Sequence, residues 1–234
     1  GMMITALAKA ATFLNEHRYM LAAQQAADYL WQYHFDQSSG LFRISLDGNR
    51  SIHASQEDYA YYAEGLMALY DNSGEKIWLQ RAQQLLDKMV EDFMDFSQGG
   101  FYLTSKNTKG PLISKIKSTH DGATPSGNSV ALSVLVSLAG KTESLPNQQT
   151  LSKTLAFISG KIKQQALAHT YAMLAVSESL NGEISSKITL AKGHIRASLN
   201  WLENSSQHFG VTLVIDDGWH INANKIPQKE MYPT

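Results

Sequence analysis

The feature that most constrains the fold is an internal repeat. Two segments match without a gap at an offset of 59 residues, the distance from Ala23 to Ala82. The paired positions are Ala23-Gln24-Gln25, Asp28, Asp36, Ser38, Gly40 and Phe42 in the first copy, and Ala82-Gln83-Gln84, Asp87, Asp95, Ser97, Gly99 and Phe101 in the second. The shared Asp-x-Ser-x-Gly-x-Phe ending is too long to attribute to chance, so the chain contains two copies of one structural unit.

Each copy is predicted to hold two helices followed by a turn. Apolar residues at helical spacing indicate helices at 4–15 and 19–35, 56–70 and 76–94, and 128–139 and 148–164, with a seventh at 168–180. The start of the 148–164 helix is the weakest signal, because residues 144–149 are polar and include Pro146. Gly-bounded runs at 41–46 and 101–105 predict short strands or extended segments.

Repeated helical hairpins bury their apolar faces by stacking side by side, either as an open solenoid or as a closed α/α toroid. The long connections between these hairpins favour the toroid, in which such segments line the mouth of a central cavity. The sequence therefore predicts a mainly α fold, with a helical-hairpin domain over residues 2–182.

The C-terminal part differs from the hairpins. Residues 183–205 are predicted to be a linker, and residues 206–234 a β-hairpin tail. In the tail, 209–215 alternates as a strand, 216–218 is a turn and 219–223 is a return strand. An isolated hairpin is marginally stable, so we expect it to pack on the helices, to pair with another chain, or to be loosely ordered.

The composition excludes several classes of function. Of the 234 residues, 43% are hydrophobic and 18% charged, with a net charge of -1, which is a globular balance with no excess of basic residues for nucleic acid. The absence of cysteine excludes disulfides and thiolate metal sites within the chain. No apolar run reaches the about 20 residues of a membrane span, and the start does not resemble a secretion signal. We expect no membrane partner and a cytoplasmic location.

Polar residues gather where the first helix of the second and third hairpins begins. In a toroid these equivalent helix ends point to the same mouth. A pair of carboxylates across a cavity suits glycoside cleavage, and a pair of histidines suits proton transfer at a sugar carbon beside a carbonyl. The predicted catalytic residues are His53, Asp58, His120 and Asp121, and the predicted substrate-binding residues are Glu57, Tyr59, Phe101, Ser126 and Asn128.

Structural interpretations of the same residues stay open. Ser55-x-x-Asp58 is typical of a capping box, and Pro125-Ser126-Gly127-Asn128 is typical of a turn with a helix cap. Tyr59 belongs to an aromatic cluster that suits a core as well as a sugar-binding surface. The chain has no Gly-rich phosphate loop, no His-x-x-x-His and no serine nucleophile elbow, so we expect no cofactor and no metal.

A family resemblance rests on motifs that occur in order along the chain. They are Glu57-Asp58-Tyr59-Ala60, Gly65-Leu66, Leu69-Tyr70, Trp78-Leu79, Ala82, Gly99-Gly100-Phe101 and Asp121-Gly122-Ala123-x-Pro125-Ser126-Gly127-Asn128-Ser129. Over residues 3–180 the chain resembles the C-terminal α/α-toroid part of the spermatogenesis-associated protein 20 and YyaL family. That toroid is similar to the six-hairpin superfamily, which includes N-acylglucosamine 2-epimerases and several glycosidases.

The resemblance implies a carbohydrate-related pocket and a partial α/α toroid. The thioredoxin-like domain of the family is absent from this chain, and the helices expected here amount to the second half of a toroid, as in a truncated family member. Open apolar faces of a half-toroid predict self-association. Residues 211–234, with Gly218-Trp219-His220, also resemble the beginning of the N-terminal domain of thiol:disulfide interchange proteins.

Three functions are compatible with these features. The first is a sugar epimerase- or glycosidase-like enzyme with a small sugar as its ligand. The second is a non-catalytic module that binds a sugar or a protein at the same place. The third is an assembly scaffold that recruits a partner through its open faces and the strand at 211–215.

Overall fold

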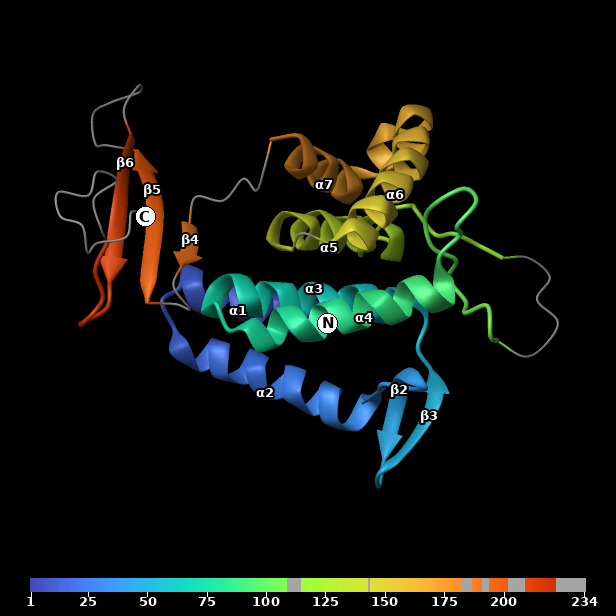
Figure 1. Ribbon diagram of the computed structural model, residues 1–234, viewed down its shortest axis with the longest axis horizontal. Coiled ribbons are helices and arrows are strands. Elements are labelled where there is room, and N and C mark those ends of the chain that lie inside the picture. The colour runs from blue at the N-terminus through green and yellow to red at the C-terminus, as the bar shows by residue number, and fades with distance from the viewer. Residues whose placement is uncertain (109–114, 143, 182–186, 191–193, 202–208, 222–234) are drawn as a thin grey trace. The chain divides into compact units, whose positions relative to one another are not determined.

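The computed structural model describes residues 1–108, 115–142, 144–181, 187–190, 194–201 and 209–221 (Figure 1). The chain divides into two compact units. The helical unit comprises Gly1–Tyr70 and Glu75–Ile184, and the second unit comprises Asp71–Gly74 and Ser185–Thr234. No helix in the described ranges has the length and apolar character needed to cross a membrane.

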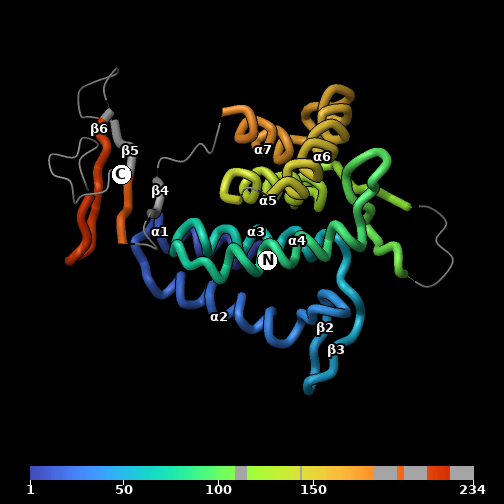
Figure 2. The backbone as a smooth tube through the Cα atoms, in the orientation of Figure 1, coloured from blue at the N-terminus to red at the C-terminus, as the bar shows by residue number. Residues whose placement is uncertain are grey.

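The seven helices predicted from the sequence are confirmed. They are α1 (Met2–Phe13), α2 (His17–His34), α3 (Gln56–Ser73), α4 (Lys76–Phe93), α5 (Gly127–Lys141), α6 (Leu145–Gln164) and α7 (Thr170–Asn181), with a short 3₁₀ turn at Ala166–Ala168. Within the helical unit, α5, α6 and α7 lie on one side of the α3–α4 pair, and α2 lies on the other (Figure 2).

The weak signal at the start of α6 has a local explanation. The Ser144 side chain accepts a hydrogen bond from the Asn147 N–H, and Pro146 occupies the first turn. Proline is favoured there because its missing N–H would have no partner within the helix. The polar residues that obscured this helix are therefore its cap.

The core of the helical unit runs across the hairpins. Fully buried side chains on successive helices include Ala8 of α1, Ala23 of α2, Leu66 of α3, Leu85 of α4 and Leu135 of α5. A smaller cluster joins α5, α6 and α7 through Leu132, Ile158, Ala172 and Ala175. Small residues at these contacts allow close approach of neighbouring helices.

Short strands fill the connection after α2. Strands β1 (Phe35–Asp36), β2 (Gly40–Leu46) and β3 (Asn49–His53) form an antiparallel sheet in that order. The predicted strand at 41–46 is confirmed, and its partner β3 is an additional strand whose residues are all exposed. Of the two alternatives predicted for 101–105, a strand or an extended segment, the structure has no strand there, and Phe101 alone forms an isolated bridge, to Met94.

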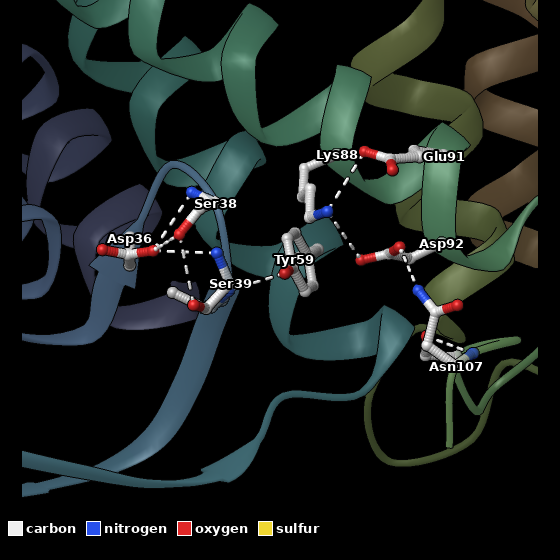
Figure 3. A network of polar contacts seen from close by, with 10 residues as sticks. Asp36, Ser38, Ser39, Tyr59, Lys88, Glu91, Asp92 and Asn107 are labelled. Carbon is white, nitrogen blue, oxygen red and sulfur yellow. Dashed lines mark hydrogen bonds and ion pairs between the residues drawn. The ribbon is translucent and has the colours of Figure 1, made fainter. Parts of the chain in front are cut away.

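The repeated motif forms the same turn in both copies. In the first, Asp36 Oδ1 accepts hydrogen bonds from the Ser38 N–H at 3.1 Å and the Ser38 hydroxyl at 2.6 Å. In the second, Asp95 Oδ1 accepts from the Ser97 N–H at 2.9 Å and the Ser97 hydroxyl at 2.6 Å. Figure 3 shows the first turn beside Tyr59 of α3. The repeat found in the sequence is thus a repeat of hydrogen-bonded structure.

The second unit contains an antiparallel sheet of β4 (Lys187–Leu190), β5 (Ile195–Trp201) and β6 (Phe209–Ile215), in that order. The predicted strand at 209–215 is confirmed. Its partner is β5, which lies in the segment predicted to be a linker, and β4 lies there too. Residues 219–221 form no return strand, and residues 222–223 are outside the described part of the chain.

Candidate functional site

The starts of three helices meet in the helical unit. Gln56, the first residue of α3, donates from Nε2 to the carbonyl oxygen of Gly127 at the start of α5, at 2.9 Å. Asp121 lies in the preceding loop and accepts from the Tyr171 N–H at the start of α7, at 2.9 Å. These bonds bring together residues that are far apart in the sequence, and they define the candidate site.

Asp58 caps the start of α3. Its Oδ2 accepts from the Ser55 N–H at 2.7 Å and from the Ser55 hydroxyl at 2.8 Å. The same oxygen pairs with Arg43 Nε of β2 at 2.7 Å. These contacts support the capping interpretation, and a catalytic role for Asp58 stays a prediction.

Asp121 holds two helix starts at once. Its Oδ1 accepts from the Ser126 N–H at 2.8 Å, and its Oδ2 accepts from the first N–H groups of α7. Ser126 in turn caps α5, accepting from the Ser129 N–H at 3.2 Å. Both residues therefore shape the backbone around the site, whatever their part in chemistry.

Three predicted substrate-binding residues lie in the interior. Asn128 is fully buried and bonds both backbone groups of Phe101, accepting from its N–H at 2.7 Å and donating to its carbonyl oxygen at 2.9 Å. The hydroxyl of Tyr59 accepts from the Leu41 N–H at 2.6 Å, and burial raises the pKa of Tyr59 to about 12. Phe101 itself has no exposed surface.

The remaining predicted residues are more exposed and have fewer bonding partners. His53 is exposed at the end of β3, with its ring 4.5 Å from that of Phe42. His120 is exposed in the loop before α5. Glu57 is half-buried at the start of α3, so close to Gly127 that a Cβ there would lie 2.6 Å from Glu57 Cγ. The Glu57 carboxylate makes no hydrogen bond with the described part of the chain.

The structure adds three residues to the site. Tyr61 and Glu64 follow Glu57 on one face of α3, at the spacing of successive helical turns. The Tyr61 hydroxyl donates to the Pro125 carbonyl oxygen at 2.5 Å, and the Tyr171 hydroxyl donates to Glu64 Oε1. Burial raises the pKa of Glu64, although the bond from Tyr171 opposes this shift.

The sequence carries a signal for two of these residues, Tyr61 and Glu64. Positions 57, 61 and 64 form a polar stripe on a helix whose other faces are buried. With a rise of about 1.5 Å per residue, Glu57 and Glu64 lie about 10 Å apart along the helix axis. Phenol and carboxylate groups arranged in this way can bind the hydroxyls of a sugar. Among the described residues, no group of three or more His, Asp or Glu side chains is arranged to hold a metal ion.

Comparison with known proteins gives sequence relatives for about 60% of the chain. No family model matches the chain. Human spermatogenesis-associated protein 20 is 32% identical over 151 residues, which is 61% of this chain and 19% of that protein. The chain is similar to part of spermatogenesis-associated protein 20. The rat spermatogenesis-associated protein 20 is 31% identical over the same shares of both chains, so the resemblance seen in the motifs is confirmed.

Solved structures show the fold. The cellobiose 2-epimerase of Spirochaeta thermophila superposes with a TM-score of 0.58 at 18% identity, over 78% of this chain and 53% of the enzyme. A family 76 glycoside hydrolase (mannosidase) of Bacteroides thetaiotaomicron gives a TM-score of 0.54 at 18% identity, over 76% of this chain and 51% of that chain. The prediction of a mainly α, partial α/α-toroid fold is confirmed.

Proposed function

We propose that the helix starts around Glu57 bind a sugar, and that the protein acts on it as an epimerase- or glycosidase-like enzyme. The fold supports a carbohydrate-related role, since both compared enzymes act on sugars by name. The observation that carries the proposal is Glu57, a carboxylate left without a hydrogen bond beside three helix starts that other residues hold rigidly in place.

The proposal divides the site residues by task. Glu57 accepts hydrogen bonds from sugar hydroxyls, and the ring of Tyr61 offers an apolar surface to the sugar. His120, exposed in the adjoining loop, is the acid or base that gives a proton to the sugar or takes one from it. Asp58, Asp121, Ser126 and Asn128 keep the helix starts in position through the bonds described above.

Binding of neutral sugars by titration calorimetry tests the site. We expect cellobiose or mannobiose to bind, and Glu57→Gln to weaken that binding by about tenfold, because a charged acceptor is lost. Glu91→Gln is a matched control on α4, where the carboxylate is 59% exposed. Absence of binding, or equal binding by wild type and Glu57→Gln, would show that the site is placed wrongly.

A non-catalytic binding module is the alternative. An assay of turnover distinguishes such a module from an enzyme. Incubation with cellobiose in D₂O, followed by NMR, detects deuterium entering the sugar at C2 or cleavage to glucose. We expect one of these products with wild type and at least a hundredfold slower formation with His120→Ala. Tight binding without any product would favour the binding module.

A further inference from the structure

Charge is unevenly distributed along the chain, although the net charge is only -1. Residues 1–95 contain thirteen acidic and seven basic residues, whereas residues 96–177 contain eight lysines and two acidic residues. Helix α6 alone has three lysines and no acidic residue. Such a charge asymmetry within one chain indicates a surface that binds a partner of the opposite charge.

The fold places two of the α6 lysines beside aromatic rings. Lys153 Nζ lies 6.0 Å from the centre of the Phe96 ring, and it donates to the Phe96 carbonyl oxygen at 2.9 Å. Lys161 Nζ lies 5.7 Å from the centre of the Phe157 ring. The Phe96 side chain is 57% exposed, so its ring is accessible next to a positive charge.

The segment at 115–117 continues this arrangement. Lys117 Nζ lies 4.5 Å from the centre of the Phe157 ring and 4.9 Å from that of Tyr102. Lys115 Nζ lies 5.3 Å from the centre of the same Tyr102 ring. These contacts connect one continuous set of lysines and rings, which we call the basic face: Lys115, Lys153, Lys161, Phe96, Tyr102 and Phe157.

The three lysines of the basic face keep their charge available for a ligand. Lys117 is the exception at this place, because its side chain is 10% exposed and its Nζ pairs with Asp95 at 2.7 Å. Within the described ranges, no carboxylate forms an ion pair with Lys115, Lys153 or Lys161. The basic face therefore presents positive charges that the described residues do not neutralise.

We infer that the basic face binds single-stranded nucleic acid. Phosphate groups pair with the three lysines, and a base stacks on the exposed ring of Phe96. An acidic peptide would need the charges alone, whereas rings placed among lysines suit a ligand that has flat rings as well as negative charges. The basic face shares no residue with the proposed sugar site, so this inference does not depend on that function.

The salt dependence of binding tests the role of the lysines. The full chain is titrated into a fluorescein-labelled 12-nucleotide oligothymidylate, and anisotropy is measured at several salt concentrations. We expect the logarithm of the affinity to fall with the logarithm of salt with a slope of about -2, because each of three phosphate contacts contributes about 0.7. Lys115→Gln, Lys153→Gln and Lys161→Gln should each reduce the slope by about 0.7 and weaken binding about fivefold at 0.1 M salt. Lys76→Gln, at an exposed lysine of α4, is the matched control and should change neither.

The ring of Phe96 distinguishes nucleic acid from acidic protein. Phe96→Leu is expected to weaken oligothymidylate binding at least about fivefold with the salt slope unchanged, because stacking is lost and no charge is. Tyr29→Leu, at a 52% exposed ring of α2, is the control. Equal competition by polyglutamate of the same charge, or no effect of Phe96→Leu, would assign the basic face to acidic protein and overturn the inference. Failure of the oligothymidylate to bind at low salt, or unchanged binding by the three lysine variants, would overturn it as well.

Discussion

Asp36 and Asp95 occupy equivalent positions in the repeat but lie in different surroundings. Asp36 is partly exposed, and the Arg50 guanidinium approaches it at 3.6 Å. Asp95 is buried, pairs with Lys117 Nζ at 2.7 Å and accepts from the Tyr102 hydroxyl at 2.6 Å. The Lys117 ammonium also lies 4.5 Å from the centre of the Phe157 ring of α6. The second turn is therefore buried and is bonded to the surrounding chain through Asp95.

Asp95→Asn is therefore expected to lower the free energy of unfolding by about 3 kcal/mol, because it leaves the buried Lys117 ammonium without its counter-charge. Asp36→Asn removes the same group from an exposed turn and should cause a much smaller loss of stability. Chemical denaturation at pH 7 compares the two variants. Equal losses would mean that burial does not distinguish the two turns.

The same ion pair predicts the response to acid. Burial alone would raise the pKa of Asp95, but hydrogen bonds from Lys117, Ser97 and Tyr102 outweigh it and hold the pKa well below its usual range. The stabilisation is present above the unfolded pKa of about 3.9 and is lost as the pH falls toward the folded value. We expect the melting temperature of wild type to fall more steeply between about pH 5 and 2 than that of Asp95→Asn.

Each turn of the repeat is attached to the first helix of the next hairpin. Leu41 donates to Tyr59 of α3, and Phe101 bonds to Asn128 of α5. The second turn also passes close to α6, the other helix of that hairpin, and glycine is required there, since a Cβ on Gly99 would lie 2.2 Å from the carbonyl oxygen of Lys153. Gly99 also has a φ of +78°, a conformation that other residues adopt only with strain.

Gly99→Ala should consequently destabilise the protein by several kcal/mol or prevent folding, because the obstacle is backbone and cannot move aside. Gly48→Ala is the matched control. Gly48 has a φ of +77°, yet a Cβ there meets nothing within 4 Å, so only the backbone strain of about 1 kcal/mol applies. Thermal unfolding monitored by circular dichroism compares the two, and similar melting temperatures would contradict the role given to this contact.

Sequence patterns predicted the helices and strands better than they predicted the contacts between them. The helices were predictable because each carries apolar residues at a period that a single segment reveals. Strand β3 was missed because all five of its residues are exposed, so it lacks the alternation that marks a half-buried strand. The bond between Glu64 and Tyr171 joins residues 107 positions apart, so it is visible only in the folded chain.

Apolar side chains lie exposed on the first and the last helix of the helical unit, α1 and α7, and just before α7. Leu167, Leu174 and Leu180, at and before α7, are 88%, 63% and 78% exposed, and Met3 and Phe13 of α1 are 69% and 68% exposed. We propose that these faces bind a second copy of the chain, because exposed apolar surface of this kind is typical of interfaces.

Light scattering after size exclusion tests this proposal. We expect a mass twice the 25.9 kDa of one chain, and a shift to monomer with Leu174→Ser. Leu46→Ser is the control, since Leu46 is 69% exposed but lies on the β2–β3 hairpin. A wild-type monomer at every concentration would exclude the second copy as the partner.

The attachment of each turn to the helix that follows it has a consequence for synthesis. The backbone N–H of Leu41 gains its partner only when Tyr59 is present, and that of Phe101 only when Asn128 is present. Because the ribosome delivers the chain from the N-terminus, a newly made hairpin stays incomplete until the next first helix has emerged. During translation, each hairpin therefore completes its hydrogen bonds only after the first helix of the next hairpin has been synthesised.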